Sequence, residues 1–217
     1  RLQINDSIAI RGLAGKFSTS GGLDGTFTGT VNGGTQVAGT VVPQKGRTAV
    51  RLTSGDAGGV LASAGFLKQA RGGNLSLTLL PVGTGGAFDG QLDIRNVRIK
   101  DAPAIAALLN AISIVGLVDE LSGTGIYFSE VDAAFRLGPS QVTLTQASAV
   151  GPSMGLSMDG VYDIPTKRLD MQGVISPVYL LNGIGSILTR KGEGLIGFNY
   201  ALGGTASAPD VSVNPLS

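Results

Sequence analysis

Leu-Ile-Gly-Phe-Asn-Tyr-Ala-Leu, residues 195–202, alternates large apolar side chains with small or polar ones. The large side chains Ile196, Phe198, Tyr200 and Leu202 lie two residues apart. In a β-strand, residues of one parity point to the same face of the sheet. The segment therefore predicts a strand with one strongly apolar face, which is typical of antiparallel sheets.

The same period of two recurs along the chain. It appears with turn residues between the segments in 2–10, 23–31, 75–79, 88–94, 127–137, 154–164 and 169–175. Roughly a dozen such candidates at a spacing of 8–12 residues are typical of an all-β antiparallel domain. The 35 glycines of the chain suit bends and bulges in strands better than helix.

Two segments carry apolar residues at helical spacing instead. Residues 56–69 begin with Asp56 as a candidate N-cap, and residues 101–121 begin with Asp101 and Pro103. We therefore expect a mainly β fold: a strongly curved antiparallel sheet, shaped as a β-groove or half-barrel, with two or three short helices covering or plugging it.

Length and charge limit the classes of function. A chain of 217 residues can form one sizeable domain, and we expect a single domain over 1–217, with sub-units 1–71 and 72–217 as the alternative. Sixteen basic residues against fifteen acidic ones give a net charge of +1, so the chain has no electrostatic footprint for nucleic acid.

Two motif matches do not fit their chemistry. Residues 151–155, Gly-Pro-Ser-Met-Gly, match G-x-S-x-G, but the chain has no histidine to act as the base. Residues 192–197 match G-x-G-x-x-G, but they open a predicted strand rather than a helix. Without His or Cys, a metal would need carboxylates alone. We expect no enzyme, no catalytic or metal-binding residues and no cofactor.

The apolar run 102–118 is shorter than the roughly 20 residues that a membrane-spanning helix needs. A buried helix and a helix resting at a membrane interface both remain open for this segment. A second apolar stretch follows a predicted strand at residues 178–188. The candidates for membrane or helix contact are Ile105, Leu109, Ile112, Leu180 and Leu181.

A sheet with one apolar face can pack on a second sheet, close into a barrel, be covered by helices, or leave a groove for an apolar ligand. Several stretches of glycines, prolines and apolar positions bear on this choice: 101–103 with 113–117, 123–128, 151–155, 192–200 and 209–217, and more weakly 56–61 with 72–75. Together they resemble the C-terminal region of bacterial AsmA-like proteins.

The resemblance implies a trough-shaped β-structure with an apolar interior that conducts phospholipid passively between the inner and outer membranes. It implies a periplasmic location and a tether to the inner membrane through an N-terminal helix that this sequence lacks. The expected partners are phospholipid acyl chains, with the membrane surface or outer-membrane and envelope proteins as further contacts. The alternative is a non-catalytic structural or docking domain that contacts an envelope partner or a membrane surface.

The lipid-binding hypothesis assigns an apolar groove to residues from several strands. The predicted lining is Phe27, Leu156, Met158, Tyr162, Ile196, Phe198, Tyr200 and Leu202.

Overall fold

The computed structural model describes residues 2–4, 7–83, 86–177 and 197–215. These residues form one antiparallel 14-stranded sheet whose order follows the chain, except that the short β6 pairs with β8 beside the main path. The strands are β1 (Leu2–Gln3), β2 (Ala9–Ser18), β3 (Asp24–Val31), β4 (Gln36–Gln44), β5 (Arg47–Ser54), β6 (Ala70–Arg71), β7 (Asn74–Val82), β8 (Ala87–Ile99), β9 (Ile126–Leu137), β10 (Gln141–Val150), β11 (Met154–Asp163), β12 (Leu169–Pro177), β13 (Phe198–Thr205) and β14 (Ala208–Pro215).

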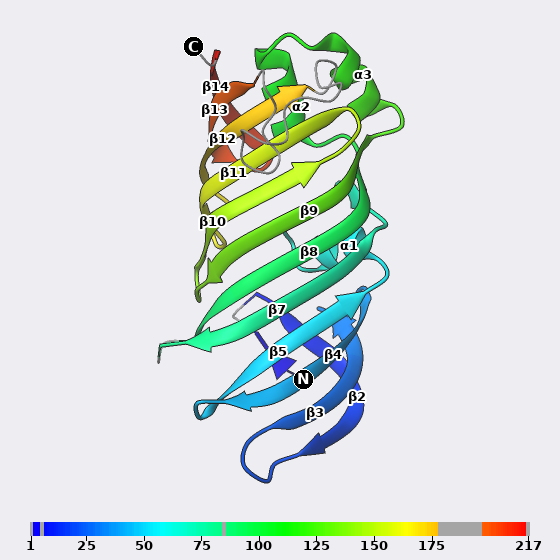
Figure 1. The fold of residues 1–217 in the computed structure, drawn as a ribbon, viewed down its shortest axis with the longest axis vertical. Coiled ribbons are helices and arrows are strands. Elements are labelled where there is room, and N and C mark those ends of the chain that lie inside the picture. Colours follow the sequence, from blue (N-terminus) through cyan, green and yellow to red (C-terminus); the bar gives the residue numbers. More distant parts are fainter. Residues whose placement is uncertain (1, 5–6, 84–85, 178–196, 216–217) are drawn as a thin grey trace, which may run out of the picture.

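The sheet is tall, strongly twisted and not closed (Figure 1). The order of strands runs from β1 at one edge to β14 at the other. Because β6 is not part of this order, β5 pairs directly with β7. The predicted fold class, a curved antiparallel sheet with a few short helices, is confirmed.

The register places apolar residues side by side on the concave face. Leu52, Leu77 and Leu92 pair in turn across β5, β7 and β8, and Leu92 pairs with Ala133 of β9. The next row belongs to the other face and is polar, since Arg51 pairs with Thr78. Strand alternation therefore produces one apolar and one polar face across the sheet.

The polar, convex face contains one dense charge cluster. Asp93 and Asp132 lie directly opposite each other on β8 and β9, a pairing that repulsion disfavours. The guanidinium group of Arg95 offsets this repulsion, with nitrogens 2.5 Å from Asp93, 2.7 Å from Glu130 and 3.9 Å from Asp132. These hydrogen bonds to Asp93 and Glu130 raise the pKa of Arg95 above its ordinary value.

Three short helices occur in the described residues: α1 (Ala57–Ser63), α2 (Pro103–Ala111) and α3 (Val115–Ser122). Asp56 is the N-cap of α1, as predicted, and its Oδ1 accepts a hydrogen bond of 2.9 Å from the Gly59 N–H. The helix is shorter than the predicted 56–69, because its last turn is followed by Gly65 at φ 83°.

The expectation of one helix over residues 101–121 is wrong. Ser113 adopts φ 59°, a left-handed conformation that interrupts an α-helix, so α2 and α3 are separate. The N-cap of α2 is Ala102, without a side-chain hydrogen bond, rather than Asp101, whose φ of 55° is incompatible with the extended conformation of that position.

Gly58 fixes α1 against the sheet. A Cβ at this position would lie 2.6 Å from backbone atoms of Ala70 and Arg71 in β6. Alanine is intrinsically favoured over glycine in a helix by about 1 kcal/mol, but here the backbone contact opposes it. A Cβ at Gly55, three residues earlier, would meet no atom closer than 4.0 Å.

We therefore predict that Gly58→Ala lowers the free energy of unfolding by about 1–3 kcal/mol through overpacking. Gly55→Ala, the matched control, should change it by less than about 0.5 kcal/mol. Urea titration of both variants measures the difference. Equal stabilities would show that α1 can move away from β6 at no cost.

Candidate functional site

An apolar cavity of about 200 Å³ lies on the concave face of the sheet. Every residue that lines it is alanine, valine, leucine, isoleucine or phenylalanine. The lining residues are Ile4, Ile8, Ile10, Val31, Leu52, Val60, Leu61, Ala64, Phe66, Leu75, Leu77, Leu79, Leu92, Ala133, Phe135, Leu137, Val142 and Leu144.

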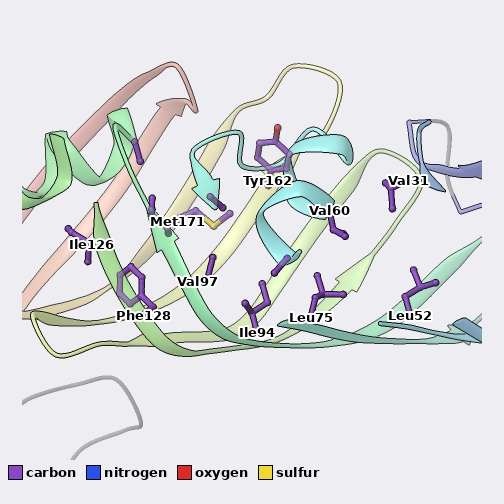
Figure 2. Packing of buried hydrophobic residues seen from close by; sticks show 14 of the residues in the cluster. Val31, Leu52, Val60, Leu75, Ile94, Val97, Ile126, Phe128, Tyr162 and Met171 are labelled. Atoms are coloured by element: carbon purple, nitrogen blue, oxygen red, sulfur yellow. The ribbon is translucent and has the colours of Figure 1, made fainter. Parts of the chain in front are cut away.

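The cavity has a floor and a roof from different parts of the chain. Strands β5 and β7 to β10 supply the floor, and α1 with the residues after it supplies the roof through Val60, Leu61, Ala64 and Phe66. The N-terminal part of the chain, up to Val31 of β3, contributes the remaining lining residues. Figure 2 shows Val60 on α1 above the side chains of Leu75 and Ile94, which rise from the sheet. The hydrophobic alternation of the strands thus meets one apolar helix face across the cavity.

The lining determines what the cavity can bind. Backbone polar groups of the floor are used in the strand ladders that join β5, β7, β8, β9 and β10. A polar ligand group would lose its hydrogen bonds to water here without replacement, at a cost of roughly 1–3 kcal/mol. The cavity therefore suits hydrocarbon and disfavours a sugar, a nucleotide or a peptide backbone.

The predicted lining residues lie mostly in another part of the concave face. Phe27, Tyr162, Tyr200 and Leu202 are buried in the core. Leu156, Met158 and Phe198 are half-buried and pack against it. None of these described residues lines the cavity, and Ile196 lies outside the described residues.

The register brings together the predicted residues of β11 and β13, but not Phe27, which lies on β3 near the other end of the sheet. Tyr200 pairs with Gly173 and Leu202 pairs with Met171 across β12 and β13, while Leu156 pairs with Ile175. They form a continuous apolar surface next to the cavity region, toward the end of the sheet that carries α2. The cavity residues that the sequence prediction missed had a signal, because Leu75, Leu77 and Leu79 alternate strictly.

The three described candidates for membrane or helix contact lie in α2 or, for Ile112, at its C-cap. Leu109 is fully buried, and Ile105 and Ile112 are half-buried against the core. Leu180 and Leu181 lie outside the described residues. Among the helices that the structure describes, none is long and apolar enough to cross a membrane.

The serine of the G-x-S-x-G match has a structural contact. Ser153 Oγ donates a hydrogen bond of 3.0 Å to Glu120 Oε1, which joins α3 to the turn between β10 and β11. Ser153 lies beside the entry to β11 rather than at a strand-to-helix elbow. In the described ranges, no group of three Asp or Glu residues is arranged to hold a metal ion.

Tyr200 makes a buried polar contact in this apolar region. Its hydroxyl donates a hydrogen bond of 2.8 Å to the Ser157 carbonyl oxygen. Burial raises the pKa of Tyr200 well above its ordinary value of 10, and the nearby Asp159 carboxylate adds to this. The phenol is therefore neutral at all physiological pH values and acts as a hydrogen-bond donor.

Searches against protein-family models, curated proteins and solved structures found no match to this chain. The function must therefore be inferred from the fold and from the chemistry of the cavity.

We predict a pH dependence of stability from Tyr200. Above pH 10 the unfolded chain loses this phenolic proton while the folded chain retains it, so the free energy of unfolding falls as pH rises. One such group contributes a slope of about 1.4 kcal/mol per pH unit. Urea titrations between pH 7 and 11 should show that Tyr200→Phe, although about 1 kcal/mol less stable at pH 7, has the shallower slope.

Tyr162 is the comparison for this measurement. Its pKa is also raised, mainly by burial and also by Asp163, so Tyr162→Phe should remove a separate part of the alkaline slope. An unchanged slope in Tyr200→Phe would contradict the assignment.

Proposed function

We propose that this chain is a passive binding module for the acyl chains of phospholipids and that it performs no covalent chemistry. The observation that carries the proposal is the cavity lined only by aliphatic and phenylalanine side chains. Most sites for polar small molecules place a few polar groups among the apolar ones to fix orientation. A lining without such groups fits a ligand that is itself only hydrocarbon.

Energetics also support an occupant. At roughly 30 Å³ per small group, the volume of about 200 Å³ accommodates about seven methylenes. Each methylene removed from water contributes about 0.8 kcal/mol, and part of this gain is offset by the freedom that a ligand loses on binding. The transfer free energy therefore favours an acyl segment as the occupant.

The resemblance to AsmA-like proteins extends the proposal to the cell. In that setting the module lies in the periplasm and belongs to a protein that is tethered to the inner membrane. It moves phospholipid between the inner and outer membranes of a bacterial envelope. The open, elongated sheet supports this role, since strands β11 to β14 extend it beyond the strands that line the cavity (Figure 1).

A second candidate is a structural or docking domain that contacts an envelope partner or a membrane surface. The packed part of the concave face favours it: Leu109, Leu117, Phe128 and Ile175 are fully buried there. A concave face filled along its whole length would need no ligand. The two candidates differ in whether the cavity takes up lipid.

Native mass spectrometry of the purified protein, with organic extraction of bound material, tests the proposal directly. We expect a co-purified phospholipid or, after delipidation, uptake of a fluorescent polyene fatty acid with an increase in thermal stability, because a ligand that binds the folded state stabilises it. A ligand-free mass, no uptake and a melting temperature insensitive to lipid would favour the docking domain.

Ala133 and Ala134 provide a matched pair of variants. Ala133 lines the cavity, while Ala134 lies on the polar face between Gln91 and Gln146. We predict that Ala133→Leu fills the cavity, raises the free energy of unfolding by about 0.5–2 kcal/mol and weakens fatty-acid binding at least tenfold. Ala134→Leu should leave binding unchanged. Equal binding by both variants would place the lipid elsewhere.

A further inference from the structure

The roof of the cavity belongs to a strap, residues 55–69, that leaves the sheet after β5 and returns to it at β6. Since β5 and β7 are neighbours in the sheet, the strap is an excursion across the concave face. A ligand lying along the trough at this point must pass between the strap and the strands, because the cavity separates the two.

Polar contacts hold the strap at its base. The N–H groups of Ala57 and Gly58 donate to the carbonyl oxygens of Gly73 and Gly72 at 2.8 and 2.9 Å. At the end of α1, the Ser63 carbonyl oxygen accepts a hydrogen bond of 3.0 Å from Asn32 Nδ2. These contacts join the start of the strap to the two glycines before β7, and the end of α1 to the turn between β3 and β4.

Further contacts act at the same turn and at the return of the strap. The Thr35 N–H donates to Ser63 Oγ at 3.1 Å, and the Lys100 N–H donates to the Gln69 carbonyl oxygen at 3.1 Å. Both ends of the strap are therefore tied to the sheet by directional hydrogen bonds.

The tip of the strap makes a different contact. The ring of Phe66 lies 5.9 Å from the ring of Tyr162 in β11, at an interplanar angle of 59°. This tilted aromatic pair spans the trough, and pairs of this geometry contribute only modestly beyond the area they bury. Phe66 also lines the cavity, so the same side chain contacts both the far wall and the ligand space.

The backbone next to Phe66 is suited to rotation. Gly65 has φ 83°, a conformation that glycine adopts without strain. No atom outside its chain neighbours lies within 4 Å of the position of a Cβ at Gly65. The Gly65 N–H donates to the Ala62 carbonyl oxygen and the Phe66 N–H to the Leu61 carbonyl oxygen, each at 3.0 Å. Rotation of the tip about Gly65 breaks the hydrogen bond from Phe66 to Leu61, while the hydrogen bonds that tie both ends of the strap to the sheet remain formed.

We propose that Phe66 is a latch that closes the strap against Tyr162, and that an acyl chain enters and leaves the cavity when this contact opens. This inference rests on the proposed lipid-binding function and adds its regulation. The strap is then a gate in the trough, closed by an aromatic contact, rather than a permanent part of the core.

A covalent lock tests the latch. The chain has no cysteine, so Phe66→Cys with Tyr162→Cys introduces the only two thiols, which a flexible bifunctional maleimide can join. We expect cross-linking to slow uptake of a fluorescent polyene fatty acid at least tenfold compared with the same double variant before cross-linking. Thr78→Cys with Gln91→Cys, a cross-strand pair on the polar face, is the matched control and should take up lipid at the same rate when cross-linked.

A single substitution gives an independent measurement if the double variant does not fold. Phe66→Ala removes the latch and should speed both uptake and release at least tenfold, whereas Phe66→Leu, which keeps an apolar contact, should show a smaller change. Uptake that is equal in the locked, unlocked and Phe66→Ala proteins would overturn the latch and leave lipid binding standing. No uptake by any protein, the unsubstituted chain included, would overturn the proposed function and the latch with it.

Discussion

An open sheet with one apolar face is stable only if that face is kept from water, and the rest of this fold follows from the requirement. A β-sandwich meets it with a second sheet. Here the cover is inserted between strands that are neighbours in the sheet: the strap lies between β5 and β7, and α2 and α3 lie between β8 and β9. Each large apolar side chain that they cover contributes about 1.5–3 kcal/mol, so the helical segments stabilise the sheet without changing its order.

Curvature of the sheet depends on glycines that face aromatic rings. Gly39 pairs with Phe27, and a Cβ there would lie 2.6 Å from the end of the Phe27 ring. Gly90 pairs with Phe135 in the same way, and a Cβ at Gly90 would overlap the ring. On the concave side of a bent sheet, side chains crowd together. A glycine opposite each ring relieves this crowding and leaves the ring lying across the neighbouring strand.

The sequence predicted the sheet well because strand alternation is a local signal: Leu75, Leu77 and Leu79 point one way whatever surrounds them. It predicted the break at Ser113 poorly, because the apolar residues on either side continue at helical spacing and serine is not a strong helix breaker. The site was harder still. Which part of the apolar face forms a cavity depends on where the strap lies, and contacts distant in sequence, such as Asn32 with Ser63 and Phe66 with Tyr162, determine this.

Two regions of the concave face differ in how completely side chains fill the space. Around α2 and α3, large side chains such as Leu109, Leu117 and Phe128 fill the space and are fully buried. Under the strap, alanines stand on both sides of the cavity, Ala64 in the roof and Ala133 in the floor. Larger residues at these positions would fill the space and add stability. A domain with only a structural role gains nothing from the alanines, whereas a module that binds acyl chains needs the room they leave.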